Sequence, residues 1–251
     1  MNLDGKSKNY GELFNPHILD LIPPGNHKIL DVGCAQGVLL QKLKESGKAS
    51  LTIGIELSSE AAEKARTRVD RVLCGDIETM DLSVHQGSCD YIIYADLIEH
   101  LRDPWAMVAK HKTLLKKSGR MIFCVPNVRN FFVITQLIRG FWNYTNRGIL
   151  DNTHLRFFTL RNILRQFERL ELKIETQFGL TPDSAWYRDT NENRDLDENI
   201  LKLFDTIREK CRKGEDCSKE LTAVFGNFKF NPEDTVELIT AQFIFSVSLH
   251  K

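Results

Sequence analysis

The stretch Ile29-Leu30-Asp31-Val32-Gly33-Cys34-Ala35-Gln36-Gly37 decides the fold of this 251-residue chain. An apolar run leads to an acid and then to a turn of small residues, and leucines follow at helical spacing over residues 37–44. This pattern predicts a strand at residues 28–32, a tight turn and a helix. Gly33 and Gly37 allow positive φ and let a ligand approach the backbone closely.

The alternation of strand and helix continues to residue 125. Ser58 and Ser59 offer helix N-caps, and Pro104 opens a helix that Gly119 is expected to end. The predicted strands cover residues 28–32, 51–55, 71–74, 91–95 and 121–125. Such alternation predicts an open, mostly parallel, doubly wound α/β sheet. Because ligands bind outside the carboxyl ends of these strands, the residues that follow each strand are the candidate site.

The second half of the chain is less regular. An acidic, Asn-rich stretch at residues 183–198 predicts an exposed loop. Apolar patterning predicts helices at residues 131–142, 160–170 and 199–213, and strands at residues 172–178 and 239–249.

Composition restricts the function. Lys and Arg number 34 and so do Asp and Glu, so a protein that mainly grips nucleic acid through phosphates is disfavoured. No apolar run approaches the roughly 20 residues that span a bilayer, which predicts a soluble, cytoplasmic protein. The six cysteines form no CxxC pair, so we expect mostly buried, reduced thiols. Cys211 and Cys217 are expected to lie near each other.

Acids after the second and third strands indicate a nucleoside ligand. Glu56 closes the second strand, where a carboxylate can accept hydrogen bonds from both ribose hydroxyls. Asp76 and Ile77 follow the third strand, where an acid and an apolar side chain suit an adenine ring. A dinucleotide site needs G-x-G-x-x-G, but Val38 occupies the third glycine position. Asp31 places a negative charge at the turn, which favours an ammonium or sulfonium ligand over a pyrophosphate.

In this order the motifs resemble those of class I S-adenosylmethionine-dependent methyltransferases. The resemblance rests on Asp31 to Gly37, Glu56, Asp76 and residues 90–101, and it spans residues 10–125. It implies a Rossmann-like sheet with strand order 3-2-1-4-5-7-6, in which residues 239–249 form the antiparallel seventh strand. Ala35 departs from the family, where glycine is common. The implied cofactor-binding set is Asp31, Gly33, Cys34, Ala35, Gly37, Glu56, Leu57, Asp76, Ile77, Ala95 and Asp96.

We therefore expect one methyltransferase domain over residues 1–251. Residues 1–26 form a lead-in, residues 27–125 a cofactor-binding core, and residues 126–251 the acceptor side. The acceptor side carries an insertion near residues 183–230, for which a substrate cap is one interpretation. A non-catalytic adenosylmethionine-binding partner protein is an alternative to an enzyme.

Two histidines stand where an acceptor would approach. An alcohol acceptor must lose its proton during an in-line methyl transfer, and histidine suits that role. His154, in the polar and aromatic loop 148–158, is our first candidate base. His100, after the fourth predicted strand, is the second. The structural alternative for both is a hydrogen bond that fixes a helix start or a loop.

A divalent metal is a second hypothesis for the same residues. Asp96, Glu99 and His100 are spaced to point from one helical turn, with His154 as a further ligand. This resembles the E-x-x-E-H pattern of ubiquinone-pathway O-methyltransferases and small-RNA 2′-O-methyltransferases, with Asp96 in place of the first Glu. A phenol, a quinone precursor or an RNA 3′ end would then be the acceptor.

A finer resemblance concerns residues 148–159 together with residues 126–129. They are similar to a bacterial subgroup associated with glycosyltransferases of surface-polysaccharide assembly. The resemblance implies a sugar or glycan hydroxyl as acceptor, with Asp151, Thr153 and Arg156 as polar contacts. The apolar segment 131–142, flanked by arginines, is expected to be a lid or core helix, with peripheral membrane contact as the alternative.

Overall fold

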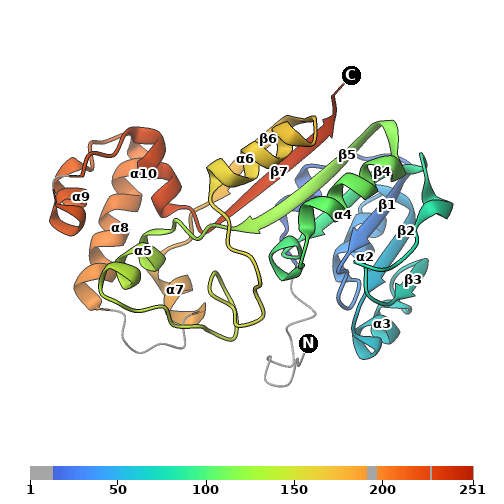
Figure 1. Ribbon diagram of the computed structural model, residues 1–251, viewed down its shortest axis with the longest axis horizontal. Helices are drawn as coiled ribbons and strands as arrows, with labels where there is room; N and C mark the ends of the chain where they lie inside the picture. The colour runs from blue at the N-terminus through green and yellow to red at the C-terminus, as the bar shows by residue number, and fades with distance from the viewer. Residues whose placement is uncertain (1–13, 191–196, 227, 251) are drawn as a thin grey trace.

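The computed structural model describes residues 14–190, 197–226 and 228–250 (Figure 1). Within these residues seven strands form one sheet in the order β3-β2-β1-β4-β5-β7-β6. β7 pairs antiparallel with both β5 and β6, and the remaining pairs are parallel. This order confirms the Rossmann-like prediction. The strands are β1 (His27–Val32), β2 (Ala49–Glu56), β3 (Arg71–Cys74), β4 (Cys89–Ala95), β5 (Leu115–Pro126), β6 (Leu172–Leu180) and β7 (Gln242–Leu249).

Helices cover both faces of the sheet, because its central strands are apolar on both sides. On one face the buried side chains of the sheet pack against α4 (Pro104–His111) and α6 (Leu160–Arg169). On the other face they pack against α1 (His17–Asp20), α2 (Val38–Glu45) and the end of α3 (Ser59–Ala65). The carboxyl ends of β1, β4 and β5 are left uncovered by these helices, and the cavity described below forms there.

Helix starts follow the local signals, but one predicted helix end is wrong. Ser58 caps α3 by accepting a hydrogen bond from the backbone N–H of Ala61, and Pro104 stands in the first turn of α4. Gly119, however, does not end that helix. α4 stops at His111, a 3₁₀ turn (η4, Lys112–Leu114) follows, and Gly119 lies inside β5. A Cβ there would come within 2.9 Å of the Cys89 carbonyl oxygen, so the glycine permits close approach between strands.

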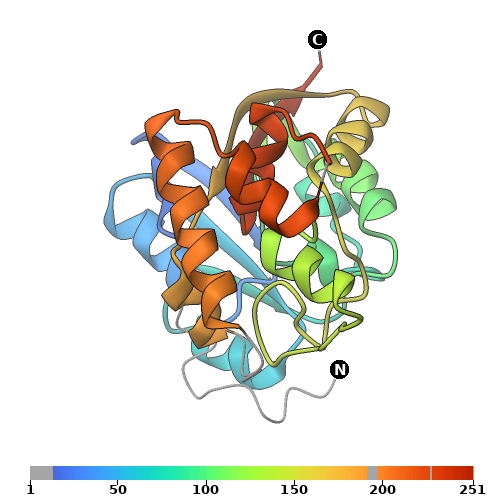
Figure 2. The ribbon, with the colours of Figure 1, turned by 90° about the vertical axis from the view of Figure 1, so that its left-hand side faces the viewer.

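A third apolar cluster forms a helical lobe beside the β5–β7 end of the sheet (Figures 1 and 2). Phe132 lies at its centre, with ring centroids 4.3 Å from Tyr187 and 4.6 Å from Phe204. The amide of Asn130 donates to the Tyr187 hydroxyl and to two backbone carbonyls, which ties the lobe to the start of β7. The lobe contains α5 (Phe131–Ile138), α7 (Ser184–Thr190), α8 (Glu198–Lys213), α9 (Ser218–Phe225) and α10 (Pro232–Ile239).

Three predicted boundaries in this half are wrong. Residues 184–190 are helical rather than an exposed loop, because buried Tyr187 anchors α7 in the lobe; residues 191–196 lie outside the described residues. The helix predicted at residues 131–142 ends at Ile138. The last strand begins at Gln242 instead of residue 239, because the preceding apolar residues belong to α10. The single-domain organisation stays a prediction.

Thiols and apolar surface mostly follow expectation. Cys34, Cys89 and Cys124 are buried, whereas Cys74 is exposed at the end of β3, contrary to the prediction. The Sγ atoms of Cys211 and Cys217 lie 3.6 Å apart as free thiols. The start of α5 is buried in the lobe, and its last residues, Leu137 and Ile138, are exposed. In the part of the chain that the structure describes, no helix is both long and apolar enough to cross a bilayer.

Candidate active site

A cavity of about 450 Å³ opens at the carboxyl ends of β1, β4 and β5. Its walls come from the turn after β1, the residues after β4 and β5, the loop 147–154, α7 and the first residues of β7. This is the edge of the sheet where the sequence predicts the site. The cavity is therefore formed partly by the strand ends of the sheet and partly by elements from the irregular second half of the chain.

The turn after β1 presents backbone to this cavity. Gly33, Ala35 and Gly37 all have positive φ, at 80°, 47° and 78°. The backbone N–H groups of Gly33 and Cys34 donate to the Ile55 carbonyl at 2.8 and 2.9 Å, which binds the turn to β2. A Cβ on Gly33 would come within 2.9 Å of Leu97 Cδ1, the end of a flexible side chain, so the positive φ is the stronger reason for glycine at this position.

Asp31 brings a buried carboxylate to the wall of the cavity. Its side chain is 3% exposed, and Oδ1 has no hydrogen-bond partner among the described residues. Burial, and then the charge of Glu56, raise the pKa of Asp31 to about 7. A buried acid of this kind gains most from a cationic ligand, so the residues present fit the ammonium group of adenosylmethionine.

Glu56 joins the turns that follow β1 and β2. Its Oε2 accepts from the Ala35 N–H at 2.9 Å, and its Oε1 accepts from the Ser58 N–H at 2.8 Å. Each carboxylate oxygen has two lone pairs, so acceptor capacity remains for ribose hydroxyls. The hydrogen bond from the Ala35 N–H to Glu56 stabilises the left-handed backbone conformation of Ala35. This explains how the turn forms without a glycine at that position.

The predicted adenine residues lie outside the cavity, next to it along the sheet edge. Glu56 pairs with Cys74 across β2 and β3, which places Asp76 and Ile77 beside Glu56 and Leu57. Asp76 is exposed, and its Oδ1 accepts from the Glu78 N–H at 2.9 Å. Ile77 is 8% exposed and Leu57 is 55% exposed. These groups thus lie along the sheet edge beside the cavity.

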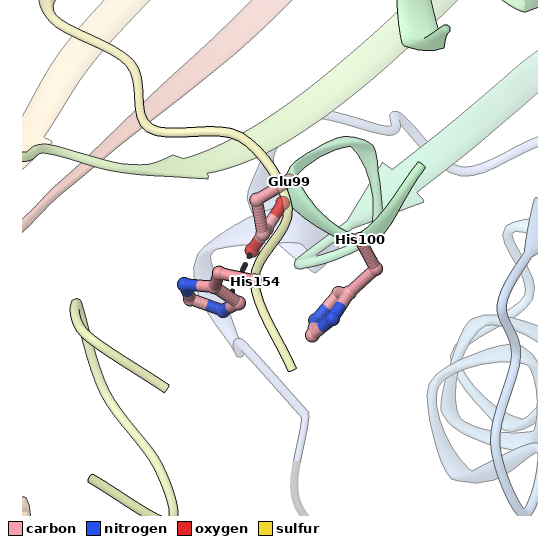
Figure 3. A group of neighbouring side chains, drawn as sticks. All are labelled: Glu99, His100 and His154. Carbon is pink, nitrogen blue, oxygen red and sulfur yellow. Dashed lines mark ion pairs between the residues drawn. The ribbon is translucent and has the colours of Figure 1, made fainter. Parts of the chain in front are cut away.

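Glu99, His100 and His154 lie close together (Figure 3), and all three line the same cavity. One ligand atom from each side chain can be chosen so that all three lie within 4.8 Å of one another. Glu99 is 1% exposed, and its Oε1 lies 3.9 Å from His154 Nε2. The two imidazole rings are edge to face, with centroids 4.7 Å apart. The sequence predicted these three residues together with Asp96, and the structure brings the three close to one another. Their role as a base or a metal site stays a prediction.

Backbone carbonyls fix the orientation of both imidazoles. His154 Nδ1 lies 3.0 Å from the Ile149 carbonyl oxygen, and His100 Nδ1 lies 3.2 Å from the Thr153 carbonyl oxygen. A carbonyl only accepts, so each Nδ1 carries the proton and donates it. In the neutral tautomer the lone pair is therefore on Nε2 of each ring. This is the arrangement that general bases and metal-ligating histidines share.

The loop and the turn that carry this cluster are joined through the backbone. η3 (Ile98–His100) holds Glu99 and His100, and the carbonyl of Glu99 accepts the N–H groups of Leu155 and Arg156 at 2.8 and 3.0 Å. The side chain of Asp151, 2% exposed, accepts from both the N–H and the hydroxyl of Thr153. These bonds fix the loop before any ligand arrives.

Several predicted contacts have different surroundings from those expected. Asp96 does not join the histidine cluster, because its Oδ1 accepts from Gln242 Nε2. Asp151 lines the cavity, but Thr153 and Arg156 do not. Arg156 donates to the Arg102 carbonyl instead, on the outside of the loop.

Other residues line the cavity that sequence reasoning did not single out. Arg147 belongs to the loop, Trp186 to α7, and Phe14 to the lead-in. Trp186 falls in the stretch interpreted as an exposed loop, so its polar neighbours concealed it. Asn15 and Gln242 complete this set.

The comparisons with known proteins agree with this geometry. The methyltransferase domain family matches residues 9–177, which is more than half of the chain. The chain belongs to this family and is a class I S-adenosylmethionine-dependent methyltransferase, with adenosylmethionine as cofactor.

Individual curated relatives share about a quarter to a third of their residues with this chain over the aligned regions. A ubiquinone biosynthesis O-methyltransferase of Thiobacillus denitrificans is 26% identical over 74% of this chain and 81% of its own length. One of Actinobacillus pleuropneumoniae is 30% identical, but the match covers 46% of this chain and 54% of the relative. The chain thus spans about half the length of most of the curated relatives it matches.

Solved structures share the fold at low identity. A methyltransferase of Archaeoglobus fulgidus superposes with a TM-score of 0.58 at 17% identity, over 92% of this chain and 90% of the other. One of Mesorhizobium loti gives 0.56 at 16% identity, over 98% and 99%. These likenesses concern the fold alone.

Proposed function

We propose that this enzyme methylates a hydroxyl group of a small acceptor, with His154 as the base that removes the hydroxyl proton. The observation that supports this most is the cluster of Glu99, His100 and His154 in the cavity that Asp31 also lines. A hydroxyl becomes a strong nucleophile only as its proton leaves, so an imidazole is needed where the acceptor approaches. N-methylation of an amine does not require this group.

Each residue has a defined part in this proposal. Bound adenosylmethionine supplies an electrophilic methyl group on a sulfonium. His154 Nε2 takes the proton of the acceptor hydroxyl, while its Nδ1–H remains bonded to the Ile149 carbonyl. Glu99, 3.9 Å away, stabilises the imidazolium that forms. His100 completes the wall and holds the acceptor oxygen in line.

Two acceptor classes are compatible with this wall. The loop resemblance supports a sugar or glycan hydroxyl, and the ubiquinone-pathway relatives support a phenol. Trp186 and Phe14 offer aromatic surface to either kind of ring. We favour the sugar on the loop residues, and a panel of nucleotide sugars, monosaccharides and catechols assayed with labelled adenosylmethionine distinguishes them. Methylation of catechols with no sugar accepted would reverse this preference.

His154→Ala tests the base. Removing a general base lowers turnover by about 10² to 10⁴-fold. We expect the affinity for adenosylmethionine to change by less than about twofold. His250→Ala is the matched control, since His250 is exposed at the far end of β7. Turnover by His154→Ala at the wild-type rate would end the assignment.

A divalent cation is the second candidate for this cluster. Two imidazoles whose Nδ1–H groups donate to carbonyls, together with one buried carboxylate, form a common donor set for such ions. Glu99, His100 and His154 would hold the ion, which would lower the pKa of a hydroxyl bound to it. Exhaustive chelation decides between the two: activity that survives it supports the base, and activity restored only by added Mg²⁺ or Mn²⁺ supports the metal.

A further inference from the structure

Three polar side chains from distant parts of the chain form a hydrogen-bonded series along the cavity. Asn15 Nδ2 donates to Gln242 Oε1 at 3.1 Å, and Gln242 Nε2 donates to Asp96 Oδ1. Asn15 precedes α1, Gln242 is the first residue of β7, and Asp96 follows β4. All three line the cavity.

The direction of this series follows from donor and acceptor chemistry. When Asp96 is ionised its carboxylate only accepts, so the amide nitrogen of Gln242 faces it. Burial raises the pKa of Asp96 to about 7, and the hydrogen bond from Gln242 opposes that rise by stabilising the ionised form. The amide oxygen of Gln242 then faces Asn15, whose nitrogen has to donate. The orientation of one amide thus fixes that of the other. Asn15 Nδ2 also approaches Cys124 Sγ at 3.8 Å, a weak acceptor that suits the same orientation.

Asp96 stands in a backbone conformation that needs such support. Its φ is +51°, which residues other than glycine rarely adopt, and its N–H donates to the Cys124 carbonyl at 3.2 Å. A strained residue persists only where its surroundings hold it, and the side-chain bond from Gln242 is one such tie. The strained residue presents a carboxylate to the cavity beside the turn after β1.

We infer that Gln242 is a positioning residue of the methyl-donor site: it holds the Asp96 carboxylate toward the cationic amino-acid end of adenosylmethionine, and Asn15 orients Gln242. The last strand of the sheet and the lead-in before β1 therefore both contribute to a site whose sequence motifs lie between them. This inference concerns the donor and does not depend on which acceptor the enzyme uses.

Binding of two ligands by calorimetry tests the inference. 5′-Methylthioadenosine has the nucleoside and the thioether but lacks the amino-acid part of adenosylmethionine. Losing the bond to a charged group weakens binding about tenfold. We expect Gln242→Leu to weaken the binding of adenosylmethionine by that factor. Its affinity for methylthioadenosine should stay within about twofold of the wild-type value. The matched control is Gln177→Leu, on exposed β6 of the same sheet, which should bind both ligands as wild type does.

Two results would overturn the inference. Wild-type adenosylmethionine affinity in Gln242→Leu would show that the bond to Asp96 is unimportant. Equal weakening of both ligands would show a general distortion of the fold instead of a positioning role. We also expect Asp96→Asn and the double variant with Gln242→Leu to bind equally, because one residue acts through the other; additive losses would contradict this.

Asn15 gives a separate test of direction. In Asn15→Asp the new carboxylate only accepts, so the Gln242 amide turns and presents its oxygen to Asp96. Asn15→Ala removes one partner without reversing the amide. We expect Asn15→Asp to weaken adenosylmethionine more than Asn15→Ala does, again with methylthioadenosine unaffected. Equal or tighter binding by Asn15→Asp would show that Asn15 does not orient Gln242.

Discussion

Replacing Asp31 by asparagine removes the buried charge that faces the cavity and keeps the size of the side chain. The pKa of Asp31 is raised from 3.8 to about 7, first by burial and then by Glu56. A raised acid pKa means that the folded state holds the proton more tightly than the unfolded state does. Below pH 3.8 Asp31 is protonated in both states and does not lower the free energy of unfolding. As the pH rises from 3.8 toward 7, Asp31 lowers the free energy of unfolding, because only the unfolded state releases its proton easily.

The size of this effect follows from the shift. About three pKa units correspond to about 4 kcal/mol of free energy against ionisation in the ligand-free fold. A bound ammonium group restores part of that energy, so adenosylmethionine should bind the ionised form and release a proton. At pH 6 about one Asp31 in ten is ionised, so affinity should be about five to tenfold weaker than at pH 7.5. Above pH 8 affinity falls again, because the α-amino group of the ligand loses its own proton.

Calorimetry at pH 6, 7 and 7.5, in buffers of different ionisation enthalpy, measures both the affinity and the protons released. We expect Asp31→Asn to bind about ten to a hundredfold more weakly at pH 7.5, since a charge-assisted contact is lost. Its affinity should change less between pH 6 and pH 7.5 than that of wild type, because Asp96, whose pKa burial also raises to about 7, still titrates in the variant. Its ligand-free form should be at least as stable as wild type at pH 8. A wild-type affinity that is flat over this range, or an acid limb as large in the variant as in wild type, would refute the reasoning.

Three further predictions concern stability, measured by urea unfolding. Gly37→Ala should lose about 1–3 kcal/mol, because φ is +78° and the new Cβ would lie 2.6 Å from Val69 Cγ2; an unchanged midpoint would contradict this. Asn130→Ala should lose about 2–4 kcal/mol, because its buried amide donates to three acceptors, and a loss below 1 kcal/mol would argue against its role as a tie. Burial, with a smaller contribution from Lys110, lowers the pKa of His111 to about 4, so wild type should lose up to about 3 kcal/mol between pH 6.5 and pH 4. His111→Gln should reduce this acid loss, and an identical pH profile would exclude His111 as its source.

Local chemistry explains what the sequence made predictable. The turn after β1 follows from an apolar strand, two glycines and an acid that lie within nine residues. The same holds for Ser58 as a cap, because the signal and the bond it makes are three residues apart. The cluster of Glu99, His100 and His154 was predictable only in part: the first two are neighbours, but His154 joins them through the backbone of its loop.

Contacts between distant residues explain what the sequence did not reveal. Gln242 carries no motif, and it meets Asp96 across 146 residues of sequence. Trp186 stands in a polar stretch whose helix depends on the packing of Tyr187 in the lobe. Gly119 lies where two strands approach closely. Because a helical pattern precedes it in the sequence, it was interpreted as the end of that helix. In each case the deciding partner lies too far along the chain for a local pattern to indicate it.

The charges of the cavity are divided in a way that suits the reaction. Asp31 lies on the wall formed by β1, where a cationic donor gains from a carboxylate. The imidazoles of His100 and His154 line the same cavity, and under the proposed O-methylation they would meet an acceptor oxygen that develops negative charge as its proton leaves. Methyl transfer moves positive charge from the donor to the acceptor, and the proposed base takes up that charge as a proton. An imidazolium beside the sulfonium would be repulsive, whereas the buried Glu99 beside His154 stabilises the imidazolium that the proposed base forms.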